Sequence, residues 1–140
     1  MCSSDLIVLA GGENVEPSPV EAALKQSPFV GQVVCLGQDQ KSIGALLVPN
    51  LDVLEQSVPK NLWDVRDGVI CGRAVQDLFR KELDRLVRRE TGFRPCDNVA
   101  AFRVITEPLT IENGLLTQTL KIRRHIVQQR YQRLIESMFG

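Results

Sequence analysis

Apolar residues along the chain follow a strand-like period in some stretches and a helical period in others. Short runs rich in β-branched residues predict strands, and two such runs on either side of a glycine-containing turn predict a hairpin. The turn at 37–41 indicates a hairpin of this kind between its two flanking runs. The strand-like runs lie at 5–10, 13–16, 30–36, 43–48 and 101–105.

Three other stretches carry the spacing of helices. The first is expected at about 19–26. Ser18 can cap this helix, Pro19 occupies its first position, and Glu21 completes a capping box. A second helix is expected at 73–91, where apolar residues recur every three to four positions. Its stripe is Val75, Leu78, Phe79, Leu83, Leu86 and Val87, and the stripe of a last helix beginning near 123 is Val127, Tyr131, Leu134, Ile135 and Met138.

Residues 50–70 show neither period and predict an irregular excursion with one helical turn near Trp63. The sum is an α+β domain of order β-β-α-β-β-α-β-α. It is expected to hold a small mixed sheet, made of a short N-terminal hairpin and about three main strands, flanked by helices.

Composition narrows the class of protein. The 140 residues allow one domain with one sizeable core. Seventeen basic and seventeen acidic side chains cancel, and aromatic residues make up only 5%, so no nucleic-acid partner is expected. No apolar stretch is long enough to cross a bilayer, and the N-terminus lacks a signal-peptide pattern. A cytoplasmic location is expected, with any peripheral membrane contact made by a further domain.

Cysteine and carboxylate spacing indicates no metal site. The cysteines are far apart and form no C-x-x-C pair, which favours a reduced, intracellular setting. Cys35 lies in an apolar run and is expected to be a buried small hydrophobe. The aspartates show no spacing typical of metal ligands, and His125 is interpreted as a surface helix residue. The cysteines are Cys2, Cys35, Cys71 and Cys96, and the aspartates are Asp39, Asp52, Asp64 and Asp67.

Two segments are more polar and richer in glycine than folding requires. The first, 11–17, reads as a tight hairpin or as a functional loop that another surface can approach closely. The second, 113–124, reads as an exposed loop that ends in a cationic helix start. Cations are disfavoured there because the helix dipole is already positive. From Lys121 onward five basic residues face one acid, which suggests a single anionic ligand, although a solvated basic helix face explains the charges equally well.

Together the two segments resemble the motifs of one family. Residues 5–17, followed by Val20 and Glu21, resemble the glycine motif that opens the C-terminal domain of adenylate-forming acyl-activating ligases. Residues 113–124, Asn-Gly-Leu-Leu-Thr-Gln-Thr-Leu-Lys-Ile-Arg-Arg, resemble the lysine motif that closes that domain. The Leu-Leu-Thr-x-Thr-Leu-Lys form is similar to long-chain fatty acyl-CoA synthetases and acyl–acyl-carrier-protein synthetases.

The resemblance implies a two-step ligase reaction. A fatty acid attacks ATP to give an acyl adenylate, and a thiol from coenzyme A or from the phosphopantetheine of an acyl carrier protein then displaces AMP. Lys121 matches the catalytic lysine of the first step. The glycine motif would line the thiol channel of the second step, and the residues around Lys121 are candidate anion contacts. These residues are Gly11, Gly12, Glu13 and Asn14 for the thiol channel, and Thr117, Thr119, Arg123 and Arg124 for the anion.

The same resemblance sets the expected domain organisation. Residues 1–5 are a hinge or an artificial boundary, with Ser4 and Asp5 as hinge candidates, and 6–140 form a mobile lid. A larger N-terminal adenylation domain would hold most of the ATP and Mg²⁺ sites. Two departures from the family are the missing Gly-Arg before the first strand and the missing glycine before Lys121.

One alternative function stays open on the sequence alone. The chain could be a stand-alone module without ligase activity that binds a carrier protein or coenzyme A through Arg88, Arg89, Arg94 and the C-terminal arginines.

Overall fold

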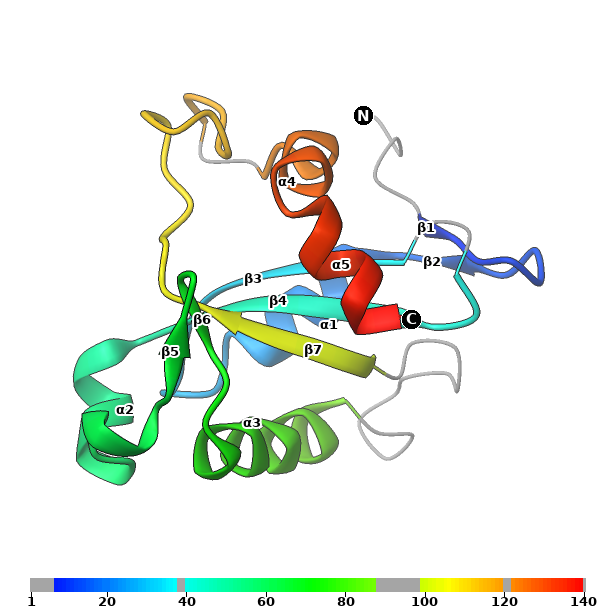
Figure 1. Cartoon of the computed structure of the whole chain (residues 1–140). Helices are drawn as coiled ribbons and strands as arrows, with labels where there is room; N and C mark the ends of the chain where they lie inside the picture. The colour runs from blue at the N-terminus through cyan, green and yellow to red at the C-terminus, as the bar shows by residue number, and fades with distance from the viewer. Residues whose placement is uncertain (1–6, 38–39, 88–98, 120–121, 140) are drawn as a thin grey trace.

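The computed structural model describes residues 7–37, 40–87, 99–119 and 122–139. Two strands near the N-terminus, β1 and β2, form a small antiparallel hairpin, and five further strands form the main sheet (Figure 1). The strands are β1 (Ile7–Val8), β2 (Asn14–Val15), β3 (Val30–Leu36), β4 (Ile43–Pro49), β5 (Val65–Arg66), β6 (Val69–Ile70) and β7 (Val99–Ile105). The helices are α1 (Pro17–Leu24), α2 (Leu51–Ser57), the 3-10 turn η1 (Lys60–Leu62), α3 (Arg73–Leu86), α4 (Arg124–Arg130) and α5 (Gln132–Phe139).

The main sheet has the order β3-β4-β7-β6-β5 and is mixed. β4 pairs antiparallel with β3 and parallel with β7, whereas β6 pairs antiparallel with both β5 and β7. Figure 1 shows α1 and α3 on one side of the sheet and α4 and α5 on the other. The arrangement confirms the predicted α+β class with its mixed sheet and flanking helices.

Both faces of the central strands are buried, so apolar residues fill successive positions instead of alternating with polar ones. One core cluster packs β3 and β4 against α1 and α3 through residues such as Val33, Leu24 and Phe79. A second cluster on the opposite face packs Val34 and Leu46 against the last two helices and the segment 109–116. Seven consecutive residues of β4 are buried, which explains why its sequence is a continuous apolar run.

Several local expectations were wrong, beginning with the first helix and the stretch 50–70. The first helix begins at Pro17 after Glu16, and no side chain caps it, so Ser18 lies inside the helix and forms no capping box with Glu21. The stretch 50–70 is more regular than predicted, because it holds α2 and the β5–β6 hairpin as well as the helical turn just before Trp63.

The expected last helix is divided at Tyr131 into α4 and α5. The second helix begins at Arg73 as predicted, but it ends at Leu86 and not at 91, because the backbone of Val87 is already extended.

Candidate functional site

The glycine motif forms the tip of the β1–β2 hairpin. Leu9 donates its backbone N–H to the carbonyl of Glu13 at 2.8 Å, and Gly12 donates to the carbonyl of Leu9 at 2.9 Å. Gly12 has a φ of +87°, a backbone conformation that residues other than glycine rarely adopt. Gly11, Gly12, Glu13 and Asn14 are all exposed, and a Cβ built on either glycine would meet no atom within 4 Å. The tip therefore leaves room for another surface to approach its backbone.

The lysine motif begins as a folded segment and is less exposed than predicted. Asn113 organises it: its Oδ1 accepts from the backbone N–H of Thr110 and of Leu115, each at 3.1 Å, and its Nδ2 donates to the carbonyl of Pro108 at 2.9 Å. Leu115 and Leu116 are buried in the second core cluster. Asparagine and threonine are common in such turns because their side chains bond nearby backbone groups.

A β-bridge brings together the two ends of the second half of the motif. Leu116 and Ile122 form an isolated antiparallel β-bridge, and Arg123 donates its N–H to the carbonyl of Leu115 at 2.8 Å. The two ends of the intervening stretch therefore lie side by side. Within this stretch Thr119 is exposed and its hydroxyl lies 2.9 Å from that of the half-buried Thr117. Lys121, Ser4 and Asp5 lie outside the described residues.

The two arginines that follow the lysine have different environments. Arg123 is exposed just before α4. Arg124 is the first residue of α4, and its Nη2 donates to Oε2 of Glu21 at 2.6 Å while its Nε donates to the carbonyl of Cys35 at 2.9 Å. Both side chains of this ion pair are only 11% exposed. Burial, followed by the nearby Glu21 carboxylate, raises the pKa of the Cys35 thiol well above its usual range.

The basic residues from 121 onward do not form one patch in the described part of the chain. Arg124 is held at Glu21. Arg130 makes a two-point contact with Glu107, at 2.9 Å from Nε and 2.6 Å from Nη2, and Tyr131 donates its hydroxyl to the same carboxylate at 2.5 Å. Neither Glu107 nor Glu21 is close to these arginines in sequence, which is why the charge pattern alone suggested a concentrated basic surface.

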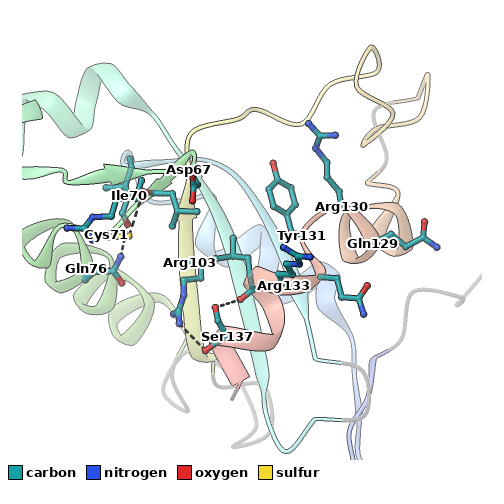
Figure 2. A pocket seen from close by; sticks show the side chains of 14 residues that line it. Asp67, Ile70, Cys71, Gln76, Arg103, Gln129, Arg130, Tyr131, Arg133 and Ser137 are labelled. Carbon is teal, nitrogen blue, oxygen red and sulfur yellow. Dashed lines mark hydrogen bonds between the residues drawn. The ribbon is translucent and has the colours of Figure 1, made fainter.

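A groove of about 860 Å³ lies between the β5–β6 hairpin and α4–α5 (Figure 2). It is lined by several arginines, but their guanidinium groups do not converge. Figure 2 shows Arg130 and Arg103 pointing to opposite ends of the groove. Arg103 donates to the carbonyls of Phe102 at 2.8 Å and Ser137 at 3.2 Å. The arrangement holds the last helix on the sheet and does not form a compact anion site.

The structure keeps the tip of the glycine motif apart from the first part of the lysine motif. In Figure 1 the tip of the β1–β2 hairpin lies at one end of the molecule, and residues 109–119 lie at the other. α1 follows the glycine motif in sequence and carries Glu21, the partner of Arg124. The sequence pattern placed Glu21 in a motif but could not indicate this pairing, because no local spacing relates residues 103 positions apart.

The described part of the chain offers neither a membrane-spanning helix nor a metal-binding cluster. None of its helices is long and apolar enough to cross a bilayer. Nor do three or more histidine, cysteine, aspartate or glutamate side chains within those residues come together where they could hold a metal ion.

Solved structures with a similar backbone are adenylation domains. The adenylation domain of a carboxylate reductase from Mycobacterium chelonae superposes with a TM-score of 0.80 at 26% identity, over 97% of this chain and 19% of that one. The corresponding domain of the carboxylic acid reductase from Segniliparus rugosus, solved with AMP and a co-purified carboxylic acid, gives 0.78 at 28% identity, over 97% of this chain and 20% of that one.

Sequence comparison identifies the family. A probable acyl-activating enzyme from Arabidopsis thaliana is 34% identical over 98% of this chain and 19% of its own length. A long-chain-fatty-acid–[acyl-carrier-protein] ligase from the same plant is 33% identical over 99% of this chain and 17% of its own length. The chain thus spans less than a fifth of either relative. Residues 4–86 match the family profile described as AMP-binding enzyme C-terminal domain, and the chain belongs to that family.

Proposed function

We propose that the chain is the mobile C-terminal domain of an ATP-dependent, AMP-forming fatty acid ligase. In this proposal Lys121 serves the formation of an acyl adenylate, and the β1–β2 tip serves the transfer of the acyl group to a thiol. The observation that carries the proposal is that, in a member of this family, the tip of the glycine motif and residues 113–119 of the lysine motif lie at opposite ends of one domain. Rotation of such a domain would exchange one motif for the other at a shared active site.

The proposed first step uses the charge of Lys121. A carboxylate and a phosphate repel each other as they approach, and an ammonium group between them offsets that repulsion. Placing charge where it develops is most of what a protein contributes to chemistry at phosphorus. The hydroxyls of Thr117 and Thr119 and the exposed guanidinium of Arg123 are donors of the kind that phosphate oxygens accept.

The proposed second step uses the backbone of the hairpin tip. A thiol carried on a long phosphopantetheine arm, either of coenzyme A or of an acyl carrier protein, needs a narrow channel to reach the adenylate. Exposed glycines at 11 and 12, with Glu13 and Asn14 beside them, can form one wall of that channel without obstructing it. The carrier-protein ligase from Arabidopsis supports including a carrier protein among the acceptors.

ATP and Mg²⁺ are assigned in this proposal mainly to an N-terminal adenylation domain. The threonine and arginine donors near Lys121 fit a contact with phosphate, and the metal would be ligated from the other domain. This chain would supply positioning and charge, whereas the fatty acid and nucleotide pockets would belong to the larger part of the ligase. That division agrees with the small share of each relative that the chain covers.

The test separates the two half-reactions in the full-length ligase. We expect Lys121→Ala to slow pyrophosphate release by about a hundredfold to a thousandfold, which corresponds to roughly 3–4 kcal/mol for one lost preorganised charge. Thioester formation from supplied acyl adenylate should change much less, because the lysine would by then have turned away. Equal loss in both half-reactions would contradict the proposed role of Lys121.

Variants of the hairpin tip should show the opposite pattern. Gly11→Leu places a bulky side chain in open space without a positive φ, so it tests obstruction alone. Gly12→Leu adds backbone strain at the φ of +87°. Both variants should keep pyrophosphate release and slow thiol transfer. If Gly11→Leu impaired adenylation first, the assignment of this tip to the second step would be wrong.

A further inference from the structure

The buried pair formed by Glu21 and Arg124 occupies the outer edge of β3. At Cys35, the Glu21 carboxylate accepts the backbone N–H at 2.9 Å, and the Arg124 guanidinium donates to the backbone carbonyl at 2.9 Å. Among the described strands β3 ends the main sheet, so no described strand pairs with the backbone N–H and carbonyl of Cys35. One acceptor and one donor side chain thus take the place that a neighbouring strand would occupy.

Such a pair is sensitive to geometry. Both side chains are 11% exposed, and charges taken out of water are compensated only when they pair closely and complete their hydrogen bonds. Here the carboxylate and the guanidinium form hydrogen bonds to each other and to the backbone of Cys35. The start of α4 is therefore held at one position on β3 and α1, and small displacements would leave a buried charge without a partner.

The pair also resolves the unfavourable placement of a cation at a helix start. On the sequence alone, an external anion was one explanation for the cations there, and a solvated basic helix face was the other. The structure supplies an internal anion, the carboxylate of Glu21. Arg124 is thus already engaged within the domain, both with this carboxylate and with the backbone at the edge of β3.

Arg124 lies three positions after Lys121 in sequence. The intervening residues are fixed from the other side, because Ile122 bridges Leu116 and Arg123 donates to the carbonyl of Leu115. The chain that leaves Lys121 is therefore anchored within three residues, on one side by the folded segment at 115–116 and on the other by Glu21. The first described residues after Lys121 are therefore held on two sides of the domain.

Resting on the proposed function, we propose that Arg124, held by Glu21, is a positioning residue for Lys121 and makes no contact with the substrate anion. The pair fixes the base from which the lysine reaches the reacting carboxylate and phosphate. Misplacing a reacting group by about 1 Å can cost on the order of a hundredfold in rate, which makes such an anchor consequential. Direct contact with the anion is then left to Arg123, Thr117 and Thr119.

The experiment compares Arg124→Gln, Arg124→Lys and Glu21→Gln in the full-length ligase. We expect Arg124→Gln to lower kcat for pyrophosphate release by about tenfold to a hundredfold, with KM for ATP within about twofold of wild type. Arg124→Lys should recover part of the rate, because it keeps the charge but not the two-pronged geometry. Arg130→Gln is the matched control, since it removes another arginine–glutamate pair of α4 that lies away from β3.

The double variant Lys121→Ala/Arg124→Gln identifies how Arg124 acts. A residue that works only through Lys121 adds no further loss once the lysine is gone, so the double variant should be as slow as Lys121→Ala alone. A rise in KM for ATP with kcat unchanged would instead show a direct anion contact and overturn the proposal. Parallel loss of both half-reactions and of the thermal midpoint would show a merely structural role and would overturn it as well.

The same set separates the inference from the function on which it rests. If Lys121→Ala left pyrophosphate release unchanged, the proposed function itself would fail. If Lys121→Ala slowed it and the double variant lost a further full factor, only the positioning role would fail. Should Arg124→Gln not fold, Arg124→Lys carries the same comparison because it keeps the positive charge, and Glu21→Gln does so because it keeps the guanidinium and an oxygen that can accept from it.

Discussion

Glu107 shows how a residue outside both motifs shapes the domain. Hydrogen bonds from Arg130 first, and from Tyr131 second, lower the pKa of its carboxyl from the ordinary value of 4.5. Burial first, and the bond to Glu107 second, raise the pKa of the Tyr131 hydroxyl to about 12. Tyr131 therefore keeps its proton at neutral pH, and Glu107 keeps its charge. Together they tie the junction of α4 and α5 to the end of β7.

This cluster predicts a pH-dependent contribution to stability. A carboxyl whose pKa is lowered by folding stabilises the native state above its unfolded pKa, and the contribution is lost as the pH falls through the folded value. Glu107→Gln should therefore lower the thermal midpoint of the chain at pH 7, and the difference from wild type should shrink below about pH 4.5. Thermal melts from about pH 3 to 7 measure this. Glu112→Gln, an exposed position in the following segment, should show no such trend.

At the scale of elements, a close backbone contact holds the stretch 50–70 against the start of α3. Gly72 precedes α3 and is buried, and it donates its N–H to the carbonyl of Trp63 at 2.7 Å. A Cβ at this position would lie 2.0 Å from the carbonyl oxygen of Leu62. No residue larger than glycine fits without moving η1 away from α3. This contact holds the segment that contains β5 and β6 against the rest of the domain.

We predict that Gly72→Ala destabilises the chain by about 3 kcal/mol, because the new methyl group must displace backbone and not a flexible side chain. Gly11→Ala is the matched control. It adds the same methyl group where no atom lies within 4 Å, and its effect should stay within about 0.5 kcal/mol. Urea unfolding of both variants provides the comparison. Equal stabilities would mean that η1 can move aside at little cost.

At the scale of the whole molecule, the proposal assigns the nucleotide pocket to another domain. The donors that this chain offers near Lys121, among them Thr119 and Arg123, are exposed and not enclosed by walls. A few exposed contacts do not offset the cost of immobilising a ligand. The 140-residue chain should therefore show no saturable ATP binding in calorimetry up to about 1 mM, whereas the full-length ligase should bind. Micromolar affinity of the chain alone would contradict this division of roles.

The sequence by itself determined the elements whose signal is local. The β-branched runs that became β3, β4 and β7, and the apolar stripe of α3, depend on neighbours within a few positions, and they were predicted close to their observed bounds. The two motifs were also recognisable, because their residues are contiguous. The Asp67-Gly68 turn was a local signal of the β5–β6 hairpin as well, but strands of two residues are too short to show a period.

Only the tertiary structure decided which distant residues meet. Arg124 reaches Glu21 and Cys35, and Arg130 reaches Glu107, across separations that no periodicity encodes. The folding of β3 as an edge strand created backbone groups that needed partners, and burial made an unpaired charge costly. Arg124 therefore anchors α4 to Glu21 and β3, Arg130 binds Glu107 instead, and the two arginines do not form one anion-binding surface.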